Sequence, residues 1–233
     1  TDDAWSLQGV KCLALDAPGA HEFIVTAAGK DDALLLFVVP RATPGLHLQA
    51  YETLDGRLAA NLRLEQVVVS EARRLGAAPD AGALLAQVLD RAGAALCAEA
   101  VGCLQHLLDT TVAYTRTRVQ FDRPIASNQV LRHRMVDMAI QCEEARAMSL
   151  RAALSTEREP QERAREVSGA KLKITRAARM VSENAVQLHG AMGVTDELDV
   201  GSYVKRLLSF EKMFGTPSEH RDRLKQLRAR RAA

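Results

Sequence analysis

The hydrophobic pattern of this chain changes its period near residue 79, and this change limits the folds that the chain can adopt. Before that point, short apolar runs alternate with turn residues such as Pro44-Gly45 and Asp55-Gly56. After it, apolar residues recur at steps of three to four, which is typical of amphipathic helices. We therefore expect an α+β protein with a small β-domain over residues 1–78 and a helical bundle over residues 79–233.

Six short segments of the first domain fit β-strands, and no long helical pattern lies between them. Turn residues separate the segments, among them Lys30-Asp31-Asp32. Such a series of strands is typical of a small barrel or a sandwich, and the sequence leaves both open. The predicted strands are Val10–Leu15, Glu22–Ala27, Leu34–Val39, Leu46–Tyr51, Ala59–Leu64 and Gln66–Val69.

The second domain is predicted to be an antiparallel bundle of four to five helices joined by tight loops. Asp80 is a favourable N-cap for the first helix. Small residues at helical spacing on the third helix suit either the core of the bundle or a contact with another subunit. The later helices are expected over residues 127–155, from Pro160 to Leu188, from a cap at Thr195 or Asp196 to Phe214, and from Pro217 onward.

Composition and charge favour a cytoplasmic protein and point to no particular macromolecular partner. The net charge is +2, and no apolar run reaches the ~18 residues that predict a membrane span. The four cysteines form no CxxC pair, which favours buried thiols in a reducing compartment over disulfides or a metal site. The basic residues from Arg221 to Arg231 have no aromatic residues between them, so we expect no nucleic-acid partner.

Two segments at the ends of the long helices carry residues suited to binding a ligand. The first runs from Arg118 to Ile125 and is followed by Gln129; it offers a guanidinium, an aromatic ring and a carboxamide. A guanidinium suits a diphosphate because its planar fork donates hydrogen bonds in pairs. The second, from Gln187 to Thr195, contains a glycine turn at which backbone can approach a ligand closely. Taken alone, each segment is equally well explained as a loop that ends a helix.

In this order and on these helices, the two segments resemble the acyl-CoA dehydrogenase family. The family has Arg-x-x-Phe-Gly-x-x-Ile and a later Gln after the first helix of its C-terminal domain, and Gln-x-x-Gly-Gly-x-Gly further on. The segment from Trp5 to Lys11 is similar to the family's Trp-x-Leu-x-Gly-x-Lys entry into its middle β-domain. The family's N-terminal helical domain and the flavin-contacting loop before that Trp lie outside the sequence. Either the chain is a fragment of a longer protein, or those parts were not included.

The resemblance implies FAD as the cofactor and an acyl-CoA thioester as the substrate. The residues of the first segment would reach across a dimer interface to the adenosine diphosphate half of a neighbouring subunit's FAD. Those of the second segment would approach the same cofactor through their turn. The implied cofactor contacts are Arg118, Phe121, Gln129, Gln187, Gly190 and Ala191.

Three departures from the family pattern concern the flavin. Asp122 stands where the family has Gly and places a negative charge close to a diphosphate. Ala191 replaces the second Gly of the later turn, which is a small change. After Lys11 the family usually has Trp-Ile-Thr, whose Thr hydroxyl binds the flavin ring. Here Cys12-Leu13-Ala14 offers no hydroxyl.

The resemblance also implies a catalytic base, and both places for it are vacant. The reaction needs a carboxylate near the α-carbon of the thioester. In most members this Glu precedes a Gly-Thr in the last loop, where this chain has Phe214; in a minority it lies on the first long helix, at the position of Ala92. We therefore expect no catalytic residue at the usual positions. Glu99 is a weak candidate for a relocated base, and Asp90 and Glu211 are more simply surface or capping carboxylates.

Three functions remain open from the sequence. The first is a subunit without its own base that completes the FAD site of a homologous catalytic subunit in a hetero-oligomer, as in bacterial members of the family that act on steroid side-chain thioesters. The second is an active homotetrameric dehydrogenase with a displaced carboxylate, Glu99. The third is a flavin-free scaffold protein with the same fold.

Overall fold

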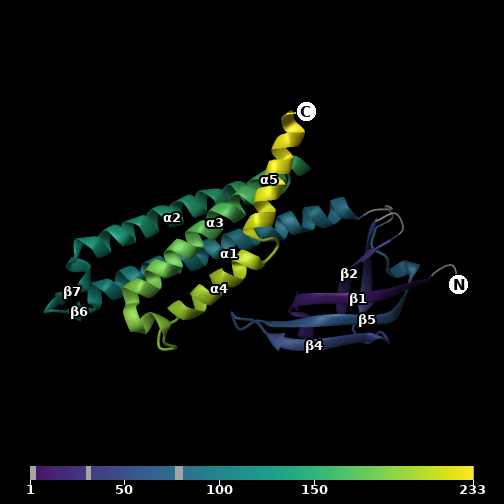
Figure 1. Cartoon of the computed structure of the whole chain (residues 1–233), viewed down its shortest axis with the longest axis horizontal. Coiled ribbons are helices and arrows are strands. Elements are labelled where there is room, and N and C mark those ends of the chain that lie inside the picture. The colour runs from purple at the N-terminus through teal and green to yellow at the C-terminus, as the bar shows by residue number, and fades with distance from the viewer. Residues whose placement is uncertain (1–3, 30–32, 77–80, 233) are drawn as a thin grey trace. The chain divides into compact units, whose positions relative to one another are not determined.

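The computed structural model of the protein describes residues 4–29, 33–76 and 81–232, with side chains as far as residue 229. Strands come first along the chain and helices follow, which confirms the predicted α+β fold class (Figure 1). The chain divides into two compact units after residue 86. The turn expected at Lys30-Asp31-Asp32 and the N-cap expected at Asp80 lie outside the described residues.

The strands of the first unit form two antiparallel sheets, one with the order β1-β5-β4 and one made of β2 and β3. Two predicted strands, at residues 59–64 and 66–69, are one long strand, β5. The strands are β1 (Ala4–Leu15), β2 (Glu22–Ala28), β3 (Leu34–Pro40), β4 (Leu46–Glu52) and β5 (Leu58–Ser70).

The polar pair at residues 65 and 66 interrupts the alternation of β5 without ending the strand. Gln66 adopts a left-handed φ of 51°, and the register between β1 and β5 shifts at this place. A β-bulge of this kind inserts one residue while pairing continues on both sides. Gly45 packs against the bulge so closely that a Cβ there would lie 2.2 Å from the Glu65 carbonyl oxygen. This close approach explains the glycine of the Pro44-Gly45 turn.

Both sheets contribute to one hydrophobic core. Phe37 and Val39 of β3 are fully buried, and so is Val67 of β5. The indole ring of Trp5 lies 5.5 Å from the Phe37 ring, measured between centroids. Two sheets that share a core in this way form a sandwich, so the structure decides between the two architectures that the sequence left open.

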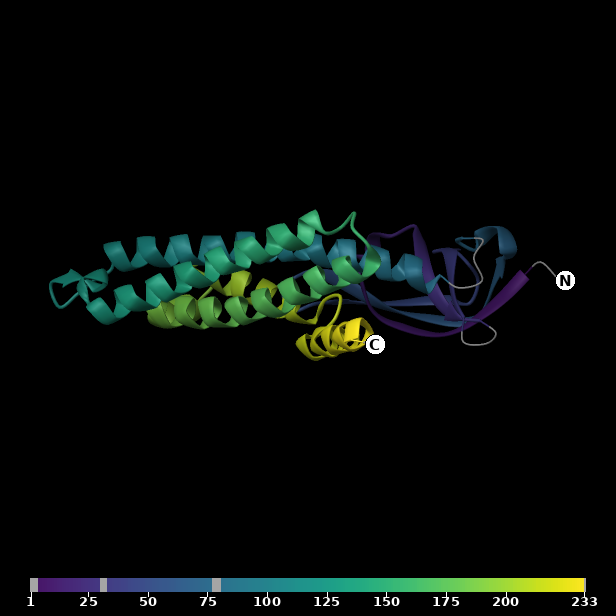
Figure 2. The same cartoon turned by 90° about the horizontal axis from the view of Figure 1, so that it is seen from above.

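The second unit is a bundle in which α1, α2 and α3 run side by side, as both views show (Figures 1 and 2). Pro160 and Pro217 open helices as predicted, because proline has no amide hydrogen to lose in the first turn. Thr216 and Glu219 add a capping box to the last helix. The helices are α1 (Gly82–Thr117), α2 (Gln129–Leu154), α3 (Pro160–His189), α4 (Val200–Lys212) and α5 (Pro217–Ala232).

The fourth helix is shorter than predicted, since it begins at Val200 and ends at Lys212. The expected cap at Thr195 is wrong for a local reason. Its hydroxyl donates to the Met192 carbonyl oxygen, 3.1 Å away, and its amide bonds the same oxygen. Thr195 therefore closes the preceding 3₁₀ helix, Gly190–Val194, and does not start α4.

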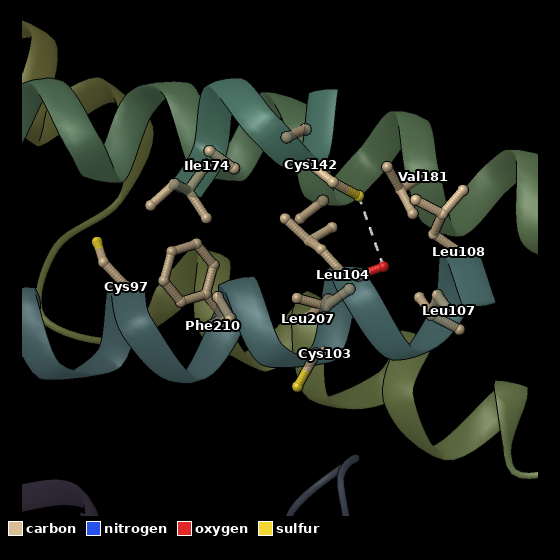
Figure 3. Close-up of a cluster of buried hydrophobic side chains, with 14 of the residues drawn as sticks. Cys97, Cys103, Leu104, Leu107, Leu108, Cys142, Ile174, Val181, Leu207 and Phe210 are labelled. Carbon is tan, nitrogen blue, oxygen red and sulfur yellow. Dashed lines mark hydrogen bonds between the residues drawn. The ribbon is translucent and has the colours of Figure 1, made fainter. Parts of the chain in front are cut away.

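The bundle core is built largely from small and aliphatic side chains (Figure 3). The small residues of α3, among them Ala170, Ala177 and Ala185, are fully buried within this chain and belong to its own core. Cys97, Cys103 and Cys142 are buried as predicted, whereas Cys12 is exposed. Burial raises the pKa of Cys97 to about 12, so this thiol stays protonated at neutral pH. Among the described residues, no helix is long and apolar enough to cross a membrane.

A buried carboxylate joins three helices of the bundle. Asp90 of α1 is 2% exposed, and its Oδ2 accepts a hydrogen bond from Arg163 Nε of α3 at 3.2 Å. Arg223 of α5 donates to both carboxylate oxygens, at 2.5 and 3.1 Å. Removal of one partner from such a group leaves an uncompensated buried charge.

We predict that Asp90→Asn lowers the free energy of unfolding by about 3 kcal/mol, because the Arg163 guanidinium would stay buried without a counter-charge. Urea unfolding followed by circular dichroism measures the change. Glu157→Gln is the control, since its ion pair with Arg91 is exposed and should contribute less than about 1 kcal/mol. Equal losses in the two variants would contradict the prediction.

Candidate functional site

The first ligand-binding segment folds into a tight hairpin after α1. Strand β6 (Val119–Gln120) pairs with β7 (Arg123–Pro124), and Phe121 and Asp122 form the two-residue loop. Both loop residues have left-handed φ values, 53° and 64°, a conformation that usually selects Asn or Gly. The Phe121 ring is 95% exposed, so the hairpin presents a large apolar group that the chain itself does not cover.

The second segment lies beside this hairpin because α1 and α3 end close together. His189, the last residue of α3, stacks against Tyr114 of α1 with 4.4 Å between ring centroids. The His189 Nδ1 atom lies 2.8 Å from the Ala185 carbonyl oxygen. Gly190 follows with a φ of 61°, so the chain turns sharply at this position.

A pocket of about 780 Å³ opens between the two segments. Five of the six implied cofactor contacts line it: Arg118, Phe121, Gln187, Gly190 and Ala191. The sixth, Gln129, is the exposed first residue of α2; it is not among the lining residues, although both its neighbours are. Arg123, His189 and Met192 also line it from within the two predicted segments, although sequence reasoning did not name them as contacts. It missed the lining residues outside the segments, among them Tyr114, Asn128 and Arg134. Helical spacing offered one signal, since Tyr114 lies four residues before Arg118 on the same face.

The pocket is positively charged, since three arginines and no Asp or Glu line it. Arg118, Arg123 and Arg134 form no ion pair with any carboxylate in the described part of the chain. Many other arginines of the bundle are ion-paired, as Arg163 and Arg206 are. Guanidinium groups without counter-charges, next to an exposed aromatic ring and a glycine turn, fit the diphosphate and the base of a dinucleotide.

The loop after α4 holds a second group of ordered contacts. Lys171 is 1% exposed, and its Nζ donates to the carbonyl oxygens of Phe210 and Met213 at 2.6 and 2.9 Å. Burial lowers the pKa of Lys171 to about 8. His220 Nε2 lies 3.1 Å from the Phe214 carbonyl oxygen. The loop backbone is therefore fixed from α3 and α5, while the Phe214 side chain remains 41% exposed.

All three carboxylates considered as relocated bases are paired with arginine. Asp90 is held by two guanidinium groups. Glu99 of α1 accepts hydrogen bonds from Arg206 of α4 at both oxygens, at 2.6 and 2.8 Å. Ala92, at the other base position, lies on the same helix and carries only a methyl group. A carboxylate with both oxygens on a guanidinium is a poor proton acceptor, because protonation would break the pair.

Glu211 of α4 is the third of these carboxylates, and it is paired with Arg179 of α3. Arg179 donates to both carboxylate oxygens, at 2.8 and 2.7 Å. These hydrogen bonds lower the pKa of Glu211 to about 2, against the opposing effect of burial.

Comparison with known proteins places the chain in a family. Residues 82–226 match the model of the acyl-CoA dehydrogenase C-terminal domain. The chain belongs to the acyl-CoA dehydrogenase family. Human mitochondrial short-chain specific acyl-CoA dehydrogenase is 33% identical over 205 residues, which are 84% of this chain and 49% of that protein. The chain thus spans about half the length of this curated relative.

Two solved structures of the family share the fold closely. The ChsE4-ChsE5 complex from Mycobacterium tuberculosis superposes with a TM-score of 0.87 at 27% identity, covering 97% of this chain and 60% of the other. A variant of the Tcur3481-Tcur3483 steroid ACAD superposes with a TM-score of 0.87 at 29% identity, covering 100% of this chain and 62% of the other. Both structures therefore share the fold of this chain.

We predict that Glu211 makes stability depend on acidity. The unfolded chain binds this proton near pH 4.5 and the folded chain only near pH 2, so the stabilisation is complete above 4.5 and is lost as the pH falls. Between pH 6 and pH 3, the stability advantage of the unmodified chain over Glu211→Gln should shrink by about 2 kcal/mol. Urea unfolding at both values tests this, with the exposed Glu183→Gln as control. An advantage that does not change with pH would contradict it.

Proposed function

We propose that this chain is a subunit of an FAD-dependent acyl-CoA dehydrogenase that completes the flavin site of a partner subunit and lacks a catalytic base of its own. One observation carries the proposal. A single pocket collects five of the six implied FAD contacts and no acidic residue, while the two base positions hold Ala92 and Phe214. The residues expected to contact FAD are present, and neither base position carries a carboxylate.

The proposed partner is a homologous catalytic subunit that carries the Glu. Support comes from two relatives of the same fold that are each named as a pair of proteins, one of them a steroid ACAD. By analogy we propose a hetero-oligomer that acts on an acyl-CoA thioester, with a steroid side chain as the candidate acyl group. The proposed substrate class comes from the family resemblance. The proposed cofactor-binding role comes from the pocket of this chain.

Each residue of the pocket has a task that follows from its chemistry. The Arg118 guanidinium can donate paired hydrogen bonds to a diphosphate. The exposed Phe121 ring can cover an apolar face of the cofactor, and the turn at Gly190 lets backbone approach it. FAD, when bound, accepts the hydride from the β-carbon of the substrate. The α-proton must pass to a carboxylate, which we assign to the partner subunit.

We predict that the chain expressed alone has no acyl-CoA dehydrogenase turnover, and that co-expression with its catalytic partner gives a flavin-loaded, active complex. The reason is that the base positions of the solitary chain carry no carboxylate. Activity assays, together with the visible absorption of bound flavin near about 450 nm, measure both properties. Full flavin loading and turnover by the solitary chain would contradict the proposal. A complex that never contains flavin would favour the scaffold function.

Arg118→Met in the complex provides the matched loss of function. It should weaken FAD retention while leaving assembly intact, because the side chain lines the pocket without any ion pair in the described structure. Arg116→Met, two residues earlier, exposed and outside the pocket lining, is the control.

We further predict that Glu99→Gln leaves the turnover number of the complex within about threefold of the unmodified value. Glu99 is engaged by Arg206 in a bidentate pair and serves in our proposal as a structural group. Steady-state kinetics of the complex test this. Loss of turnover with FAD still bound would identify Glu99 as the displaced base and would restore the homotetramer alternative.

A further inference from the structure

The N-terminus of α2 forms part of the same pocket, and its capping is unusual. Asn128 stands at the N-cap, where an Asn side chain normally accepts a hydrogen bond from the first turn of the helix. Here it makes no such bond. Its Oδ1 accepts from Arg123 Nη2 at 3.1 Å, and its Nδ2 donates to the Ile125 carbonyl oxygen at 3.1 Å. The side chain orients Arg123 and leaves the helix end open.

The first turn of α2 has two backbone amides that no atom of the described chain accepts. Within the described chain, the amides of Gln129 and Val130 have no hydrogen-bond acceptor. The helix is 26 residues long, so its N-terminus carries the full partial positive charge of an α-helix. Asn128 and Val130 both line the pocket.

Arg134, one turn after Val130, adds a third guanidinium group to the same pocket, and its Nη1 donates only to the Asn184 amide oxygen, 3.4 Å away, among the described residues.

The charge of the site also agrees with a diphosphate. Three guanidinium groups line the pocket, and the neighbouring hairpin adds one carboxylate, Asp122. The balance is two positive charges, which equals the charge needed to neutralise a diphosphate that links two esters. Arg118 by itself would only balance the charge of Asp122, so the additional arginines supply the positive charge that a diphosphate needs in spite of this departure from the family pattern.

We propose that Arg123 forms a second phosphate-binding element of this pocket, beside Arg118, and that Asn128 is the positioning residue that orients Arg123. The ligand class is the diphosphate of an adenine nucleotide, and its identification with FAD rests on the proposed function. A neutral amide suits this position because it directs the guanidinium without neutralising it. A carboxylate at residue 128 would instead pair with Arg123 and cap the helix.

The experiment measures the binding of ADP to the full chain by NMR titration at low ionic strength. Arg123→Met should weaken ADP binding about tenfold to a hundredfold, the loss expected for one charge-assisted hydrogen-bonding partner. Arg132→Met is the matched control, because Arg132 is exposed on the same helix and is not in the pocket lining. Its affinity should stay within about twofold of the unmodified chain.

Asn128→Asp separates a positioning role from a structural one. It should weaken ADP binding at least about tenfold while the thermal unfolding midpoint stays equal or rises, because Asp caps a helix as well as Asn does and adds an ion pair with Arg123. A structural role would make stability and binding fall together. In the Arg123→Met background, Asn128→Ala should cause no further loss of affinity, since the residue it orients is gone.

The proposal is overturned if the unmodified chain binds no ADP, if Arg123→Met and Arg132→Met lose equal affinity, or if Asn128→Asp binds as well as the unmodified chain. These outcomes are distinct from failure of the proposed function. ADP binding by the solitary chain does not depend on a partner, a base or turnover, so the second phosphate-binding element can be refuted while the subunit role stands.

Discussion

The contact between the C-terminal ends of α1 and α3 is the interaction on which the ligand pocket depends. At one end of their contact, Gly93 lies so near Val167 that an added Cβ would be 3.1 Å from the valine side chain. At the other end, Tyr114 stacks on His189. Along their length the two helices share the hydrophobic core of the bundle, and α3 lies closest to α2. Because both helices end beside the Tyr114–His189 pair, the hairpin after α1 and the turn after α3 are brought to the same place.

The sequence could predict those features of the fold that depend on neighbouring residues alone. Pro160 and Pro217 begin helices through their own missing amide hydrogens, so no tertiary contact was needed to place them. The start of α4 was wrong because the Thr195 hydroxyl can serve the turn before it or the helix after it, and only the tertiary path of Gly190–Val194 decides which. The merging of two predicted strands into β5 also depends on a tertiary contact, the pairing with β1. A bulge at Gln66 lets pairing with β1 continue through a polar pair.

The residues of the candidate site also differ in whether the sequence alone could identify them. The six residues carried over by resemblance lie in two segments whose spacing is visible in the sequence, and the fold brings five of them to one pocket. Arg134 and Asn128 could not be identified in this way, because their importance depends on which partners they have. Asn128 is the N-cap residue of α2, and only its bond to Arg123 shows that its side chain is used elsewhere. The absence of ion pairs around Arg118 likewise belongs to the folded chain and has no signature in its composition.

The distribution of charge bears on the division of labour between subunits. Acidic side chains that could abstract a proton, Asp90, Glu99 and Glu211, are each held at both oxygens by arginine. Three arginines without a carboxylate partner in the described chain line the pocket instead. The loop after α4 is fixed by Lys171 and His220, and it presents Phe214 at the position where the family resemblance places the Glu. In the proposed complex this chain holds the cofactor, and the α-proton passes to a carboxylate of the partner subunit.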